Sequence, residues 1–351
     1  MTRAARQNSI GRRQGSAMDW RRFGIGRAHA KVILFGEHAV VYGAPAVAVP
    51  VPELAVNVTA TRSADSTDCQ VLFSAVEPDM VDRLTTPEKD LLEPAGQALR
   101  LLVANCLEVF EAEDSGVDLV IDCGIPTARG LGSSAACARA VVRALADLFD
   151  RKVDEKTCFE LVQFSERLAH GTPSGVDAAA TGAVTPILFR RGSSMPLTWG
   201  FDGVFVIADS GLASSTCDAV TELRERFDRD SGRRAYFIAQ ATRLAMGALR
   251  DIEKGSLPEL GSKLTENHEL LRDVGLSTAD VDRLVVAAIG AGARGGKVTG
   301  GGTGGCVVAL ADDVEAALRI SAELRSAGAD ATWMLRVRRP AAPAVNRRTW
   351  I

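Results

Sequence analysis

A glycine loop directly before a run of small residues is the feature that most constrains this chain. Residues 126–136 read Pro-Thr-Ala-Arg-Gly-Leu-Gly-Ser-Ser-Ala-Ala, and the small-residue run continues to Phe149. Gly130 and Gly132 permit positive φ and a close approach of backbone to ligand. A helix that opens just after them offers free N–H groups and a favourable dipole to an anion. The stretch predicts a phosphate-binding loop, although a glycine-serine joint between two elements fits the same letters.

Around this loop, strands and helices mix without steady βαβ alternation, which favours an α+β fold over a doubly wound sheet. A length of 351 residues suits two domains better than one. A break at Arg-Arg-Gly-Ser-Ser, residues 190–194, predicts a boundary near residue 195. Patterning predicts a strand or a hairpin at 23–35, and strands at 47–51, 54–61, 117–123, 204–208, 297–299, 306–310 and 332–337. It predicts one helix that opens at the glycine loop and runs to Phe149. Further helices are predicted at 91–111, 154–170, 215–227, 233–254, 257–274, 278–291 and 314–327.

Composition narrows the class of partner. A nucleic-acid partner would favour a basic stripe on the protein surface, and a net charge of -3 gives no reason to expect one. No nucleic-acid partner is therefore expected. The seven cysteines are scattered without a C-x-x-C pair, which favours free thiols in a reducing cytoplasm. No apolar run suits a signal peptide or a bilayer span, so no membrane partner is expected. Residues 1–20 are expected to be a disordered leader, with Met18 an alternative start, and 339–351 a loose tail.

Two further motifs flank the glycine loop in the chain. Residues 31–43 read Lys-Val-Ile-Leu-Phe-Gly-Glu-His-Ala-Val-Val-Tyr-Gly, and residues 297–306 read Lys-Val-Thr-Gly-Gly-Gly-Thr-Gly-Gly-Cys. The ordered set resembles the GHMP kinase superfamily, over a stretch from about Gly24 to Val337. The first motif is similar to that of the mevalonate kinases, and the chain looks closest to their actinobacterial members.

The resemblance implies a fold and an activity. The fold would join an N-terminal domain like ribosomal protein S5 domain 2, residues 21–195, to a ferredoxin-like domain, residues 196–338. ATP and substrate would bind in the cleft between them. The expected reaction is ATP-dependent phosphorylation of mevalonate to 5-phosphomevalonate with Mg²⁺, a step of isoprenoid biosynthesis. A homodimer is also expected.

Residue roles follow from the same resemblance. Ser134 and Glu166 would hold Mg²⁺. Asp177 would face the attacking hydroxyl as a base or an orienting group, with Lys31 beside it keeping its carboxylate ionised. The expected ATP-phosphate contacts are Arg129, Gly130, Leu131, Gly132, Ser133, Ser134 and Ala135. Without the motifs, Glu166 pairing with Arg167 or Arg139 on a solvated face would be the favoured interpretation.

The substrate end is assigned to Glu37, His38 and Thr216. The second glycine loop, with Gly300, Gly301 and Gly302, would close over the phosphates or pack against the first loop. A structural histidine and a tight turn are the plainer alternatives for these two motifs.

The chain departs from the family pattern at several positions. Ala128 stands where the family has glycine, which is tolerable only if φ is negative there. Cys217 stands where a lysine often follows Ser-Thr, which puts substrate affinity in doubt. The remaining departures are His29-Ala30 for Pro-Gly and Thr172 for Asn. A phosphomevalonate kinase and a catalytically inactive ligand sensor on the same fold remain the rival functions.

Overall fold

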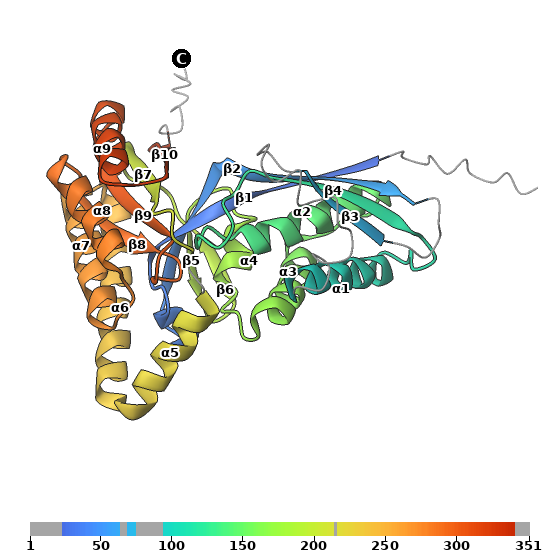
Figure 1. The fold of residues 1–351 in the computed structure, drawn as a ribbon, viewed down its shortest axis with the longest axis horizontal. Coiled ribbons are helices and arrows are strands. Elements are labelled where there is room, and N and C mark those ends of the chain that lie inside the picture. The colour runs from blue at the N-terminus through green and yellow to red at the C-terminus, as the bar shows by residue number, and fades with distance from the viewer. Residues whose placement is uncertain (1–22, 64–68, 75–93, 214–215, 341–351) are drawn as a thin grey trace, which may run out of the picture.

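The computed structural model describes residues 23–63, 69–74, 94–213 and 216–340. The expected leader, 1–20, and residues 341–351 of the expected tail lie outside this part of the chain. Strands and helices assemble into two sheets with separate helical layers, joined end to end (Figure 1). The predicted α+β class is confirmed.

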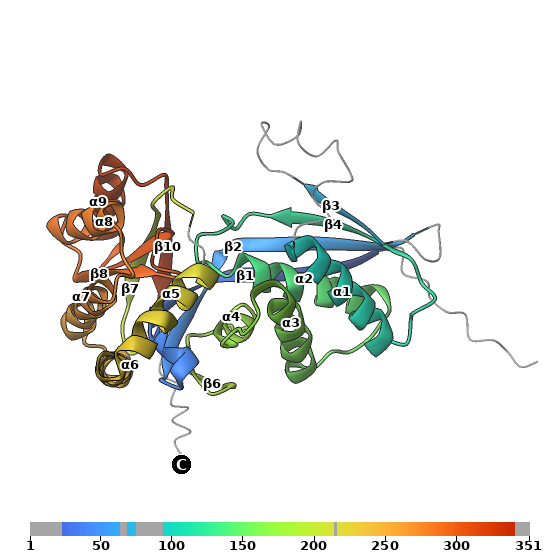
Figure 2. The same ribbon diagram turned by 60° about the horizontal axis from the view of Figure 1, so that its bottom comes forward.

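The first sheet has the order β3-β4-β2-β5-β6, and β1 pairs with β2 off this path. Only the β3–β4 pair is parallel; the other pairs are antiparallel. The strands are β1 (Phe23–Phe35), β2 (Ala46–Arg62), β3 (Cys69–Ser74), β4 (Val117–Cys123), β5 (Ile187–Arg190) and β6 (Ser193–Pro196). Its helices are α1 (Pro94–Val109), α2 (Ser133–Leu148), α3 (Glu155–His170) and α4 (Val176–Ala180), with a 3-10 turn η1 (Ala39–Tyr42). Helices α1, α2 and α3 lie on one face of this sheet (Figure 2).

The small residues of α2 have a packing reason. A Cβ on Gly26 of β1 would lie 1.9 Å from the carbonyl oxygen of Ala140, and one on Gly24 would lie 2.2 Å from that of Ala144. Helix α2 therefore lies flush against β1, which fixes the N-terminus of α2 relative to the strand that carries Lys31.

The second sheet has the order β10-β7-β9-β8, antiparallel throughout. Its strands are β7 (Gly203–Asp209), β8 (Gly295–Thr299), β9 (Cys306–Ala311) and β10 (Ala331–Val337). Numbered within the domain this is 4-1-3-2, the strand order of the ferredoxin-like fold that the family resemblance implies. The helices are α5 (Thr216–Arg229), α6 (Ser231–Lys254), α7 (Leu257–Asp273), α8 (Ala279–Gly290) and α9 (Val314–Ser326). In Figure 1, α7, α8 and α9 lie on the side of this sheet away from the first sheet.

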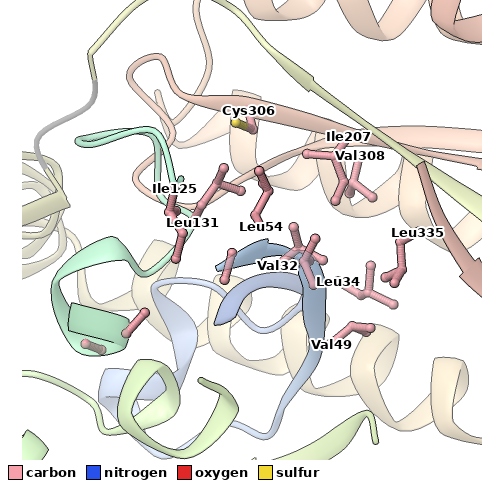
Figure 3. Close-up of a cluster of buried hydrophobic side chains, with 14 of the residues drawn as sticks. Val32, Leu34, Val49, Leu54, Ile125, Leu131, Ile207, Cys306, Val308 and Leu335 are labelled. Atoms are coloured by element: carbon pink, nitrogen blue, oxygen red, sulfur yellow. The ribbon is translucent and has the colours of Figure 1, made fainter. Parts of the chain in front are cut away.

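One hydrophobic core runs through both sheets. Figure 3 shows buried side chains from β1 and β2 meeting those from β7, β9 and β10: Val32, Leu34, Val49, Leu54, Ile207, Cys306, Val308 and Leu335. Because this apolar contact is continuous, the ends of the two domains that face each other are packed together.

Several predictions of local structure need correction. Residues 47–51 and 54–61 form one strand, β2, because Pro50 and Pro52 are accommodated beside a register shift in β1 between His29 and Ala30. Strands β3, β5 and β6, helix α4 and η1 have no counterpart among the predicted elements, since each is too short to show a clear periodicity in the sequence. Among the described residues no helix is long and apolar enough to cross a membrane.

Candidate active site

Lys31 and Asp177 form an ion pair, as expected. Lys31 belongs to β1 and is almost fully buried, while Asp177 lies in the first turn of α4. The Lys31 Nζ lies 2.8 Å from Asp177 Oδ1 and donates to the Gly130 carbonyl at 3.0 Å. The Asp177 side chain keeps 37% of its surface exposed, so its carboxylate can still meet a ligand.

The first glycine loop adopts the conformation that its sequence predicts. Gly130 and Gly132 have φ of 76° and 75°, and Gly132 is the N-cap of α2 with no side-chain cap. A Cβ on Gly132 would lie 2.9 Å from Lys31 Cε, and with the positive φ this close approach favours glycine between the loop and the lysine. The first N–H groups of α2 have no helical acceptor and lie beside this loop, where they can bind phosphate oxygens.

Ser134 and Glu166 come together from α2 and α3. The Ser134 hydroxyl donates to Glu166 Oε1 at 2.6 Å, and Glu166 is buried. Burial raises the pKa of Glu166 and the nearby Asp177 charge adds to it, while the Ser134 hydrogen bond opposes the rise. Glu166 therefore does not lie on a solvated face.

This oxygen pair fits Mg²⁺. Mg²⁺ prefers oxygen ligands and is often held by one or two carboxylates together with substrate phosphates and waters. A carboxylate and a hydroxyl beside a phosphate loop supply that protein share. Among the described residues no group of three or more His, Cys, Asp or Glu side chains forms a complete metal cage. Phosphate oxygens would therefore be needed to complete the coordination.

The second glycine loop joins β8 to β9 and packs against the first. Gly300 has φ of 93°, and a Cβ on it would lie 2.6 Å from Gly130 Cα. The reverse distance, from a Cβ on Gly130 to Gly300 Cα, is also 2.6 Å. Of the two expectations for this loop, packing against the first loop is what the structure shows.

Glu37, expected to contact substrate, is instead engaged inside the protein. Its side chain is 2% exposed and pairs with the ammonium of Lys297, which is fully buried in β8. Asn267 Nδ2 donates to the other carboxylate oxygen at 3.4 Å. With both oxygens occupied and no open surface, this carboxylate cannot reach a substrate in this conformation. The sequence reasoning missed this role because Lys297 is 260 residues away.

His38 is buried in a strained backbone conformation. It has φ of 57°, and neither ring nitrogen has a hydrogen-bond partner of adequate geometry. Burial lowers its pKa to about 4, although the neighbouring Gly300 and Gly301 backbone opposes the shift. The imidazole is therefore neutral near pH 7. Buried polar groups normally find partners, so the unpaired ring is unusual, although its nitrogens, like the Glu37 carboxylate, have no open surface in this conformation.

Arg129 and Ala128 differ from what the sequence suggested. The Arg129 guanidinium pairs with Asp209 at the end of β7, at 2.8 Å, and donates to the Gly211 carbonyl at 3.1 Å. Its side chain thus connects the loop to the second domain. Ala128 has φ of 55°, so the condition of negative φ is not met and the residue keeps a glycine-like conformation.

The remaining substrate-end residues are only partly visible. Thr216 begins α5, but its side chain and that of Cys217 lie outside what the structure describes. An open cavity of about 350 Å³ lies beside η1 and the turn 172–174, which leads to Asp177. Arg191 and Arg224 line its other sides.

Comparison with known proteins gives the same class. The family described as "GHMP kinases N terminal domain" matches residues 99–183, and "GHMP kinases C terminal" matches 248–330. The mevalonate kinase of Pyrococcus horikoshii is 32% identical over 300 residues, covering 82% of this chain and 88% of that protein. That of Aeropyrum pernix is 30% identical over 293 residues, covering 83% and 89%. The crystal structure of L. major mevalonate kinase in complex with R-mevalonate superposes with a TM-score of 0.77, at 25% identity over 91% and 97% of the two chains.

Fold and site together define a kinase of the GHMP type, with two glycine loops meeting over a lysine, two carboxylates and a serine. The extent of the sequence matches is more specific. The chain belongs to the mevalonate kinase family of GHMP kinases. Its kinase relatives imply that it uses ATP. Pyrococcus horikoshii and Aeropyrum pernix are archaea, so the expected closeness to actinobacterial members is not supported.

Proposed function

We propose that the protein transfers the γ-phosphoryl group of ATP to the hydroxyl of mevalonate, giving 5-phosphomevalonate. The observation that carries the proposal is the Lys31–Asp177 pair beside the Ser134–Glu166 pair at the N-terminus of α2. One pair suits the attacking hydroxyl and the other suits the nucleotide phosphates. Phosphoryl transfer requires little more than this positioning and charge stabilisation.

The residues divide the work as follows. The N–H groups of Ser133, Ser134 and Ala135 bind phosphate oxygens at the start of α2. Ser134 and Glu166 hold Mg²⁺, which when bound neutralises the charge of the phosphates. Asp177 accepts a hydrogen bond from the mevalonate hydroxyl, either removing its proton or orienting it. The Lys31 ammonium keeps the carboxylate in place and adds positive charge beside the reacting groups.

For the substrate end, we propose His38 and Thr216 as contacts. The unpaired neutral imidazole of His38 supports its role, because a ligand would satisfy nitrogens that the protein leaves without partners. We no longer propose a direct contact between Glu37 and the substrate, since Lys297 and Asn267 occupy the carboxylate oxygens of Glu37. Cys217 supplies no charge, so we expect mevalonate affinity to depend on these fewer contacts.

The test is a coupled ADP-release assay with Mg²⁺-ATP and four acceptors: mevalonate, phosphomevalonate, homoserine and galactose. Turnover with mevalonate alone, lost in Asp177→Ala, is the expected result. Phosphomevalonate is included because Arg191 and Arg224 line the cavity beside the site and could receive a substrate phosphate. Turnover with another acceptor but not with mevalonate would refute the substrate assignment. ATP binding without turnover of any acceptor would favour a ligand sensor.

Three wider assignments are also proposals. A domain division close to residues 195 and 196 is supported by the change of sheet between Pro196, the last residue of β6, and Gly203, the first of β7. A cytoplasmic location is supported by the free thiols of Cys106, Cys123, Cys137, Cys158 and Cys306. A homodimer without nucleic-acid or membrane partners is the assembly we expect, and light scattering of the purified protein would test it.

A further inference from the structure

The outer edge of β1 holds both glycine loops. Among the described strands β1 pairs only with β2, so every second residue of β1 directs its N–H and C=O away from the sheet. The outward-facing N–H of Lys31 does not bond to β2; it donates to the Leu131 carbonyl of the first glycine loop, at 3.0 Å. Two residues along, at Ile33, the free N–H donates to Thr299 Oγ1, also at 3.0 Å.

Thr299 satisfies both backbone groups of Ile33. Its hydroxyl accepts from the Ile33 N–H and donates to the Ile33 carbonyl, each at 3.0 Å. The same carbonyl accepts from the Lys297 ammonium at 3.3 Å. Thr299 is fully buried and ends β8, so the next residue is Gly300 of the second glycine loop. A single hydroxyl thus imitates the backbone pairing that another strand would provide.

These contacts close a ring. Lys31 is tied to Gly130 through its side chain, and Gly130 packs against Gly300. Gly300 follows Thr299, which is tied to Ile33, two residues from Lys31. The position of the second loop over the first is therefore set relative to the lysine of the active site. Displacements of about 1 Å in such a constellation cost on the order of 100-fold in rate.

We propose that Thr299 is a positioning residue that registers the second glycine loop on the first through the free edge of β1. This proposal rests on the proposed function in that it takes the loops to bind ATP phosphates. Thr299 itself touches no reacting group. Removing its hydroxyl leaves the Ile33 N–H without its partner and the Ile33 carbonyl with Lys297 alone, which frees the second loop to shift away from Gly130.

The experiment compares Thr299→Val, Thr299→Ser and Thr332→Val in the full chain. Thr332→Val is the matched control, because Thr332 belongs to β10 of the same sheet and its Oγ1 also has two partners, Ser321 at 2.7 Å and Arg325 Nε at 2.9 Å in α9. Affinity for Mg²⁺ with AMP-PNP is measured by calorimetry well below each melting temperature. We expect about tenfold weaker binding in Thr299→Val, equivalent to ~1.4 kcal/mol. Thr299→Ser should stay within about threefold and Thr332→Val within about twofold of the unmodified protein.

A merely structural role would lower the melting temperature of Thr299→Val but leave the affinity of the folded protein unchanged, and that outcome overturns the proposal. Equal weakening in Thr332→Val overturns it as well. If Thr299→Val does not fold, Thr299→Ala removes the same hydroxyl and takes its place in the titration. A protein that binds AMP-PNP but does not turn over mevalonate would refute the proposed function, while the affinity comparison would still decide the role of Thr299.

Discussion

Two buried lysines each pair with one carboxylate, and the two pairs differ in exposure. Lys31 is 3% exposed and its partner Asp177 is 37% exposed. Lys297 is fully buried and its partner Glu37 is 2% exposed. Both pairs lie close to the glycine loops, one under the first and one under the second.

The difference in exposure separates two uses of the same chemistry. A half-open carboxylate can exchange a water for a substrate hydroxyl, so the Lys31–Asp177 pair can take part in a reaction. A sealed pair has only protein partners, so Lys297 and Glu37 hold backbone in place. Burial lowers the pKa of Lys297, and the Glu37 charge opposes that shift and helps to keep the ammonium charged. Exposure of the partner, more than the presence of a salt bridge, distinguishes a reactive pair from a structural one.

The largest expected effect on activity comes from the open pair. Asp177→Asn keeps the shape of the side chain but removes its charge, and we expect kcat to fall by about 10²–10⁴-fold. Steady-state kinetics with mevalonate would measure this, alongside thermal unfolding of both proteins. A variant that retained more than a tenth of the activity would contradict the reactive role assigned to the open pair.

The largest expected effect on stability comes from the sealed pair. Lys297→Met leaves the Glu37 carboxylate buried without its cation, which should cost about 3–5 kcal/mol of unfolding free energy. Denaturant unfolding would measure the loss. Adding Glu37→Gln should restore much of it, because the uncompensated charge is then gone. Lys156→Met is the control, since its partner Glu160 is exposed and the pair should contribute about 1 kcal/mol at most.

Glu166 lies between the two extremes, because it is buried but expected to meet Mg²⁺. The folded protein takes up the proton at higher pH than the unfolded chain, since burial raises the pKa of Glu166. Its contribution to stability is therefore present below the unfolded pKa and is lost as pH rises through the folded value. Mg²⁺ needs the ionised form, so Mg²⁺ affinity should fall as pH drops through the raised pKa.

Glu166→Gln sharpens this distinction. We expect the pH-dependent part of Mg²⁺ activation to disappear and activity to fall by about 100-fold, while unfolding free energy at pH 7 stays equal or rises. Mg²⁺ titrations of activity between pH 5 and pH 8, with denaturant unfolding beside them, would measure both. A strong loss of stability in this variant would place Glu166 with the sealed pair instead.

The smallest expected effect concerns the backbone of the first loop. Ala128 holds φ of 55°, a conformation that costs an alanine roughly 1–2 kcal/mol. Ala128→Gly should stabilise the fold by about 0.5 kcal/mol after the added chain entropy of glycine is subtracted. Denaturant midpoints would measure it. Ala279→Gly, at the exposed start of α8, should instead destabilise slightly, and a loss in Ala128→Gly would show that the loop carries no strain.

Local sequence patterns determined much of the fold. Strand β1 has the bounds that its pattern predicts, Phe23–Phe35, and so does β4. Helix α3 begins at the predicted N-cap Asp154, whose side chain accepts from the Thr157 N–H, and ends at Gly171. These features depend on periodicity and capping within a few residues, which a sequence shows directly.

The residues that we propose as reactive were also accessible from the sequence, through motif resemblance. Lys31 beside Asp177 and Ser134 beside Glu166 meet as the ordered motifs imply. That inference depends on the resemblance, because without the motifs the sequence favoured Glu166 pairing with an arginine on a solvated face.

Only the tertiary structure decided which polar groups are sealed and which remain open. Glu37 meets Lys297 across 260 residues, and Ile33 meets Thr299 across 266. Arg129 turns to Asp209, 80 residues away, although its place in the glycine loop suggested phosphate. The competition between a substrate and an internal partner for the same side chain depends on burial and distance, and both are set only when the two sheets pack together.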